Sequence, residues 1–177
     1  IKKGGTLTYA LEVDSPFTGI FLAELSDTGP DQTVSDPGEE SLFAHDKNRQ
    51  YNNLGAATLK LNQQSKTATI VVKKNVRWSD GKPVTAKDVE YAYEILANSK
   101  VNTTMYNSNL EDLKGVSEYH HGKTNKISGI ELPDGPNGKK VVLHFKEMVP
   151  AMLEVGNSYI WNYAAPYHYL KMFRLIN

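Results

Sequence analysis

The chain contains no cysteine. This absence excludes disulfide scaffolds, thiolate nucleophiles and metal sites with cysteine ligands. Long hydrophobic runs are also missing, and the sequence opens on Ile-Lys-Lys-Gly-Gly instead of a charged region followed by an apolar one. No signal peptide or membrane span is therefore predicted. We expect a soluble chain, or a mature chain whose export signal is absent.

An excess of charge of either sign is lacking too, since 20 Lys and Arg residues balance 20 Asp and Glu residues. A balanced chain does not attract nucleic acid or an anionic membrane through its net charge. We expect a neutral or mixed ligand and no nucleic acid. With 177 residues, the chain can bury the core of one ordinary domain, or of one domain plus part of another.

The motifs of most enzymes are missing as well. The sequence has neither the Gly-x-Ser-x-Gly of serine hydrolases nor the glycine-rich motifs that bind phosphate. Its five histidines do not include a His-x-x-x-His pair, a spacing typical of metal ligands on a helix. We predict no catalytic residue, no metal and no cofactor.

One tripeptide suggests an alternative from another class of protein. Asp27-Thr28-Gly29 matches the tripeptide of aspartic proteases, in which two copies bring carboxylates together to activate water. That chemistry needs the tripeptide at the end of a buried apolar strand, whereas here it lies in a polar stretch before Pro30. A turn is the favoured interpretation, and an aspartic-type protease using Asp27 is the alternative.

The first half of the chain shows the patterns of strands. Alternation over residues 6–11 predicts a half-buried first strand, which has no partner nearby and is expected in another sheet. Residues 26–53 are rich in Asp, Gly, Pro, Ser and Asn and predict a surface connection. Residues 57–61 and 67–73 flank a polar tract, which indicates an antiparallel hairpin.

A capped helix follows this hairpin. Thr85 stands where an N-cap is expected, Asp88 follows three residues later, and apolar residues recur at helical spacing. These signals predict a helix over residues 86–98.

The rest of the chain completes one α+β unit. We predict a second helix over residues 109–116, a second hairpin from residues 127–132 and 140–146, and a short helix that opens at Pro150. No internal repeat interrupts this order.

Aromatic residues are concentrated near Asn and Ser in the second half of the chain. Such residues suit adaptable binding clefts, because each joins a large apolar face to a polar tip, but they also fill cores. The densest run covers residues 157–163 and includes Trp161 and Asn162. For this run, cleft and core both remain open.

One stretch carries a resemblance to a known family. Residues 76–89, Val-Arg-Trp-Ser-Asp-Gly-Lys-Pro-Val-Thr-Ala-Lys-Asp-Val, resemble the signature of the oligopeptide and dipeptide substrate-binding proteins of ABC importers. Three further groups of segments agree with this family in order: 4–7; 114–119 with 122–123 and 127–131; and 142–145 with Pro150 and 165–167.

This resemblance implies a mixed fold, part α+β and part α/β. It implies an inserted hairpin-and-helix lobe plus the first strand of the main lobe of a periplasmic-binding-protein-like class II fold. Residues 1–40 would form the first segment of the main lobe and 41–165 the inserted lobe. Residues 166–177 would start the return to the main lobe, where the sequence is apparently truncated. Only the amino-terminal part of the family's chain is matched.

The resemblance also implies a function without catalysis. Proteins of this family capture oligopeptides outside the cytoplasm and deliver them to a membrane permease. The expected form is a monomeric lipoprotein at the cell surface of a Gram-positive bacterium, or a periplasmic protein. It would contact the membrane only through a lipid anchor that would have preceded Ile1. A pheromone, a nickel complex or another small solute is the alternative ligand.

The ligand contacts implied by the resemblance lie after the first strand and on the capped helix. There, backbone groups would bind an extended peptide while pockets accept its side chains. In the family, the acidic residue that pairs with the peptide's amino terminus lies on a lobe that this sequence lacks. The aromatic run adds two weaker candidates. The predicted contacts are Val13, Asp14, Ser15, Phe17, Tyr91, Trp161 and Asn162.

Overall fold

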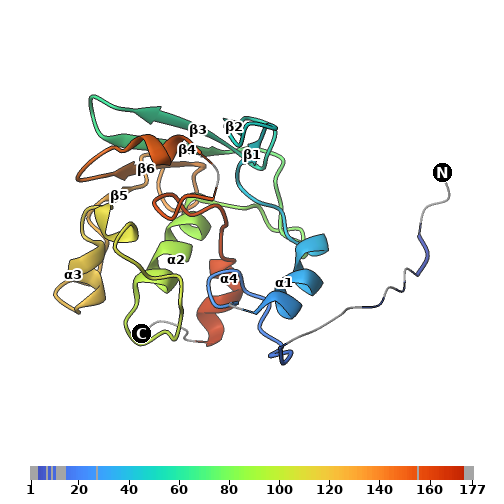
Figure 1. The fold of residues 1–177 in the computed structure, drawn as a ribbon. Coiled ribbons are helices and arrows are strands. Elements are labelled where there is room, and N and C mark those ends of the chain that lie inside the picture. The colour runs from blue at the N-terminus through green and yellow to red at the C-terminus, as the bar shows by residue number, and fades with distance from the viewer. Residues whose placement is uncertain are drawn as a thin grey trace.

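The computed structural model describes residues 4–6, 8, 10, 15–26, 28–154 and 156–173. An antiparallel sheet in the order β3-β4-β6-β5 lies at the top of the molecule, with α2 below it (Figure 1). Its strands are β3 (Ala57–Asn62), β4 (Thr67–Val72), β5 (Ile130–Glu131) and β6 (Lys140–His144). A separate pair is formed by β1 (Ala44–His45) and β2 (Tyr51–Asn52).

The helices are short apart from α2. The α-helices are α1 (Gly29–Ser35), α2 (Ala86–Ala97), α3 (Val116–His120) and α4 (Tyr167–Leu170). The 3₁₀ turns are η1 (Asp36–Gly38), η2 (Leu110–Asp112), η3 (Pro150–Leu153) and η4 (Lys171–Phe173). Among the described residues, no helix has the length and apolar character needed to cross a membrane.

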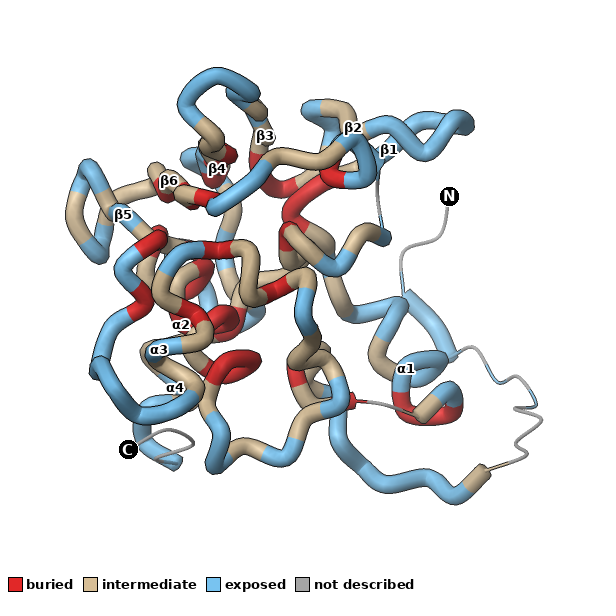
Figure 2. The backbone as a smooth tube through the Cα atoms, turned by 60° about the vertical axis from the view of Figure 1, so that its left-hand side comes forward, coloured by how far each residue is buried: buried red, intermediate tan, exposed pale blue. Residues whose placement is uncertain are grey.

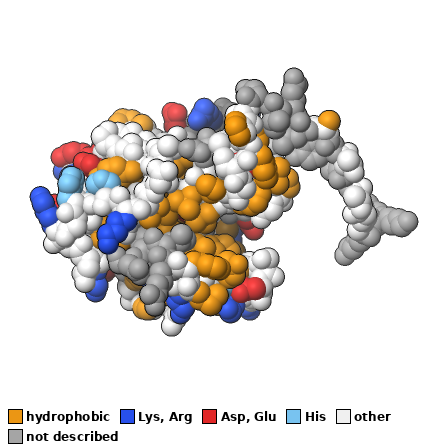
Figure 3. Space-filling view, turned by 90° about the horizontal axis from the view of Figure 1, so that it is seen from below, with side chains coloured by type: hydrophobic (Ala, Val, Ile, Leu, Met, Phe, Trp, Pro, Cys, Tyr) orange, Lys and Arg blue, Asp and Glu red, His pale blue; other side chains and the backbone are white. Residues whose placement is uncertain are grey.

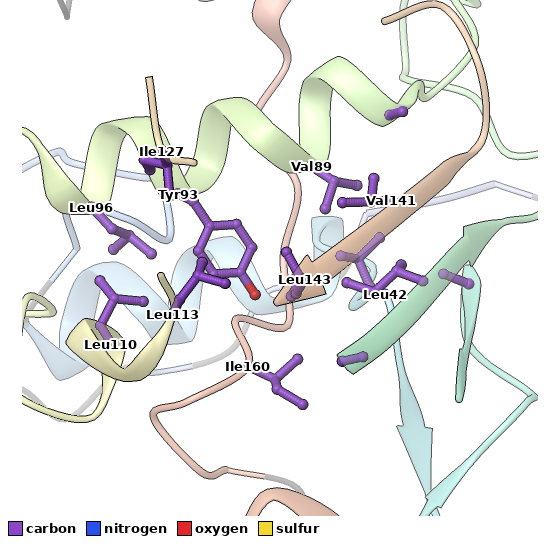
Figure 4. Close-up of a cluster of buried hydrophobic side chains, with 14 of the residues drawn as sticks. Leu42, Val89, Tyr93, Leu96, Leu110, Leu113, Ile127, Val141, Leu143 and Ile160 are labelled. Carbon is purple, nitrogen blue, oxygen red and sulfur yellow. The ribbon is translucent and has the colours of Figure 1, made fainter. Parts of the chain in front are cut away.

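Alternation along the strands produces the core. In β4, Ala68, Ile70 and Val72 share one face and are at most 1% exposed, as expected for side chains two residues apart. On β6, Val141 and Leu143 are fully buried under α2 (Figure 4). Burial of each such side chain contributes about 1.5–3 kcal/mol. The predicted hairpin of residues 57–61 and 67–73 is confirmed, because β3 pairs with β4 in antiparallel register, with Ala57 opposite Val72.

The helix predicted over residues 86–98 is also confirmed and ends at Ala97. Its N-terminus is a capping box, in which the backbone N–H of Thr85 donates to Asp88 Oδ2 at 2.7 Å. The buried residues concentrate where α2 meets the sheet (Figure 2). This helix therefore anchors the core.

The prediction of one helix over residues 109–116 is wrong. Here η2 ends at Asp112, Leu113 forms an isolated bridge with Phe145, and α3 begins at Val116. Gly115 interrupts the helical path, because its φ of 83° lies in the left-handed region.

The prediction that residues 26–53 form a surface connection is incomplete, because this stretch contains α1, η1 and two short strands. Pro30 stands at the start of α1 and Asp31 in its first turn, both of which suit a helix N-terminus. Polar composition concealed these signals.

The strand predicted over residues 6–11 is absent from Thr6, Thr8 and Ala10. These residues are exposed and pair with no described strand, and a strand without a partner is not stable in water. Residues 7, 9 and 11 lie outside the described part.

The two remaining predictions are confirmed in shorter form. The second hairpin consists of β5 and β6, whose register places Ile130 opposite Leu143. The short helix at Pro150 is the 3₁₀ turn η3.

Candidate functional site

A cavity of about 350 Å³ lies where the first segment, defined as residues 15–26, meets the turn after β4 and the chain that leads to α4. Its lining combines apolar and aromatic surface with more acidic than basic groups. Among the lining residues are Phe21, Glu24, Glu39, Arg77, Trp78 and Tyr163. The cavity is therefore formed by segments that are far apart in the sequence.

Glu24 is the most unusual side chain near this cavity. It has no exposed surface, and its Oε1 accepts a 2.9 Å hydrogen bond from Trp161 Nε1. Its Oε2 has no partner among the described residues. Burial raises the pKa of the Glu24 carboxyl to about 7, although the Trp161 bond acts in the opposite direction. Glu24 therefore titrates near neutral pH.

Trp161, a predicted ligand contact, connects three parts of the chain. Besides the bond to Glu24, its backbone N–H donates to Tyr93 Oη of α2 at 3.0 Å. The carbonyl of Glu24 in turn accepts a 2.6 Å bond from the hydroxyl of Thr103. These contacts give Trp161 a structural role, and its role toward a ligand stays a prediction.

Asn162 uses both ends of its side-chain amide within the fold. Its Oδ1 accepts the N–H of Phe43 at 2.8 Å, and its Nδ2 donates to the Phe43 carbonyl at 3.3 Å. Its own carbonyl accepts the N–H of Leu42 at 2.8 Å. The side chain therefore joins the chain before β1 to the chain before α4. Its predicted contact with a ligand also stays a prediction.

Tyr91 lies on α2 and is only 2% exposed. Its ring meets that of Tyr167 edge-on, with 5.1 Å between the ring centroids. Ile95 and Ala165 belong to the same cluster. In the described part of the chain, Tyr91 is packed against α4, and its contact with a ligand stays a prediction.

Ser15 and Phe17 lie on the first segment, apart from this packed cluster. Phe17 is 54% exposed, and its ring lies 5.6 Å from that of Phe21. Hydrophobic side chains gather on the face of the molecule seen from below (Figure 3). The predicted contacts Val13 and Asp14 lie outside the described residues.

Asp88 links the signature of residues 76–89 to the chain around α4. It is 2% exposed, and its Oδ2 accepts bonds from Thr85 N–H at 2.7 Å and Trp78 Nε1 at 3.3 Å. Its Oδ1 accepts the backbone N–H of Tyr167 at 2.9 Å. Trp78, Thr85 and Asp88 of the signature therefore stabilise the fold.

Sequence reasoning missed Glu24. The signal that could have found it is a single acidic residue within the largely apolar run 20–25. Charged side chains are seldom fully buried unless they are paired. An isolated carboxylate in such a run therefore marks a special environment or an exposed edge.

Comparison with known proteins identifies relatives over most of the chain. The oligopeptide-binding protein OppA of Lactococcus lactis subsp. cremoris is 44% identical over 160 residues, which is 89% of this chain. The solved structure of lactococcal OppA complexed with an endogenous peptide, in the closed conformation, matches with a TM-score of 0.86 and 43% identity. It covers 90% of this chain and 30% of that one. OppA of Haemophilus influenzae matches at 22% identity with a TM-score of 0.67, over 86% of this chain and 29% of that one, and shows the fold alone.

The chain spans 27% of the length of the lactococcal relative. The predicted fold class, a mixed α and β part of a periplasmic-binding-protein-like fold, is confirmed by these structures. A model of bacterial extracellular solute-binding proteins, family 5 Middle, matches residues 50–172. That family is described as solute-binding, and the match gives no support to the protease alternative on Asp27, a residue outside the described part. The chain belongs to the bacterial extracellular solute-binding proteins of family 5.

Proposed function

We propose that the complete protein captures oligopeptides outside the cytoplasm and delivers them to the membrane permease of an ABC importer. One observation carries this proposal: the chain is 43% identical to lactococcal OppA, solved with a bound peptide, and matches its structure over 90% of its own length. A monomer, attached to the membrane by a lipid anchor, is the form in which such a protein would work.

The division of the chain into lobes is part of the same proposal. Residues 1–40 and 166–177 would belong to the main lobe, and residues 41–165 would be the inserted lobe. The bonds between Asn162 and Phe43 support these boundaries, because they bring the two ends of the inserted part together. The bond between Glu24 and Trp161 then ties the first segment to that part.

We expect the ligand to contact the chain mainly through the first segment. Phe17 is exposed there, whereas Tyr91, Trp161 and Asn162 are engaged within the fold. Val13, Asp14 and Ser15 would supply backbone groups to an extended peptide, in the manner of strand addition. A surface of this kind covers only one side of a ligand. The isolated chain should therefore bind peptides weakly or not at all.

Native mass spectrometry with a random peptide mixture tests the proposal. The complete protein should retain peptides through desalting, and the 177-residue chain should not. A complete protein that retains no peptide would contradict the proposed function. Retention of a nickel complex or of one defined peptide only would instead favour the alternative ligands. Tight capture by the isolated chain would contradict the one-sided surface.

A further inference from the structure

Large apolar side chains are exposed on the first segment. Phe17, Ile20 and Phe21 are 54%, 41% and 47% exposed, and they flank Gly19, whose φ is +77°. Exposed apolar groups that lie together mark interaction sites more often than chance. A surface loop of this kind would normally be mobile, so a residue that fixes it matters for binding.

Asp31, in the first turn of α1, holds this loop. Its Oδ2 accepts the backbone N–H of Thr18 at 3.0 Å and the Thr18 hydroxyl at 2.6 Å, and its Oδ1 accepts the N–H of Gly19 at 2.8 Å. The hydroxyl of Thr28 donates to the same carboxylate. One side chain therefore fixes both residues at the centre of the loop.

The chemistry of the site requires an ionised carboxylate. Asp31 has no exposed surface, and all the groups around it are donors. Burial would raise the pKa of Asp31, but the bonds from Thr18, Thr28 and Gly19 outweigh it and lower the pKa to about 2. An asparagine could not replace this group, since its amide nitrogen is a donor and would face other donors.

We propose that Asp31 is a positioning residue for peptide binding: it holds the loop of residues 15–21 in the conformation that presents Ser15 and Phe17 to the ligand. This inference rests on the proposed function. Asp31 does not itself touch the peptide. It acts by ordering the loop before the ligand arrives, which removes part of the entropic cost of binding.

The test uses Asp31→Asn in the complete protein, with Asp36→Asn as the matched control. Asp36 is exposed on η1, one helical segment away, and its carboxylate accepts no hydrogen bond among the described residues. The first measurement, hydrogen exchange without peptide, follows the amides of Thr18 and Gly19. In Asp31→Asn these amides should exchange about tenfold faster or more, as expected when a bond to a charged acceptor is lost. Amides of β4 and β6, which Asp31 does not contact, should be unchanged.

The second measurement is affinity for a peptide retained by the wild-type protein. Asp31→Asn should weaken binding about tenfold by raising the ordering cost, while Asp36→Asn binds as wild type. Thr18→Val removes one donor only and should give a smaller loss, which provides a second variant if Asp31→Asn does not fold.

Unchanged exchange at Thr18 and Gly19, or faster exchange with unaltered affinity, would overturn the positioning role. A wild-type protein that binds no peptide would overturn the proposed function and this role with it. Since the exchange measurement needs no peptide, the two failures can be told apart.

Discussion

Trp161 Nε1 donates a 2.9 Å hydrogen bond to Glu24 Oε1, across 137 positions of sequence. The bond joins the first segment to the chain that leads to α4. It satisfies only one of the two carboxylate oxygens, because Glu24 Oε2 is buried without a partner among the described residues. The contact between these two parts of the chain is therefore sensitive to the charge of Glu24.

We predict that stability falls as the pH rises from about 4.5 to 7. The pKa of Glu24 is raised from 4.5 to about 7 in the folded state, so the folded protein binds a proton that the unfolded chain has already released. This contribution is complete below pH 4.5 and is lost by the time the pH exceeds 7. Each unit of difference corresponds to about 1.4 kcal/mol, which makes the total a few kcal/mol. Urea denaturation between pH 4.5 and 8 measures it.

The matched comparison is Glu24→Gln against Glu40→Gln, an exposed glutamate that lines the same cavity. Glu24→Gln should lose this pH dependence, because the glutamine does not titrate, while Glu40→Gln should keep it. A Glu24→Gln variant with the slope of the wild type would show that another group is responsible.

In the Trp161→Phe variant, the loss of stability with rising pH should continue to a higher pH than in the wild-type protein. The indole bond lowers the pKa of Glu24, so its removal raises that pKa further and also leaves Oε1 unpaired. An unsatisfied buried acceptor costs about 1–3 kcal/mol. Denaturation of the single variants and of the Trp161→Phe/Glu24→Gln double variant measures the coupling. If the pH profile of Trp161→Phe matches that of the wild type, the bond does not control the titration.

Asp88→Asn should destabilise the fold by about 3 kcal/mol, a typical loss for a broken buried network. The carboxylate accepts bonds from Thr85, Trp78 and Tyr167, and asparagine cannot accept all of them. Asp134→Asn, at an exposed turn, should change stability by less than about 0.5 kcal/mol. Chemical denaturation compares the two, and equal effects would contradict a special role for Asp88.

Gly115→Ala should cost about 3 kcal/mol or more, as expected when backbone strain is combined with a clash. Its φ is +83°, and an added Cβ would lie 2.5 Å from the backbone nitrogen of Ser128. Gly122→Ala is the matched variant, with a φ of +68° and no atom within 4 Å of the added Cβ. It should lose only about 1–2 kcal/mol. Thermal unfolding should therefore rank the two variants, and a reversed ranking would contradict the clash with Ser128.

Local signals explain which parts of the fold the sequence could predict. Thr85 and Asp88 lie three residues apart and specify the start of α2 without help from the rest of the chain. Residues 109–116 have an equally helical pattern, but contact between Leu113 and Phe145 and the left-handed Gly115 override it. A tertiary contact such as that between Leu113 and Phe145 leaves no trace in a short window of sequence.

The candidate site was harder to predict for the same reason. Its central bond pairs Glu24 with a residue 137 positions away, and Asn162 lies 119 positions from Phe43. The aromatic run drew attention to residues 157–163, where Trp161 and Asn162 form hydrogen bonds within the fold. It could not show that the amide of Asn162 is occupied by backbone groups.

The pairing of Asn162 with Phe43 has a topological consequence. Because the chain enters and leaves the region between them at one point, that region is a closed loop whose ends are only a hydrogen bond apart. A region whose two ends lie this close together can be inserted into one loop of another fold, because that loop does not have to bridge a distance between the two ends. Circular permutation of this region, with its ends at Phe43 and Asn162 joined and new termini opened within the polar tract 62–66, should therefore preserve the internal contacts of the region.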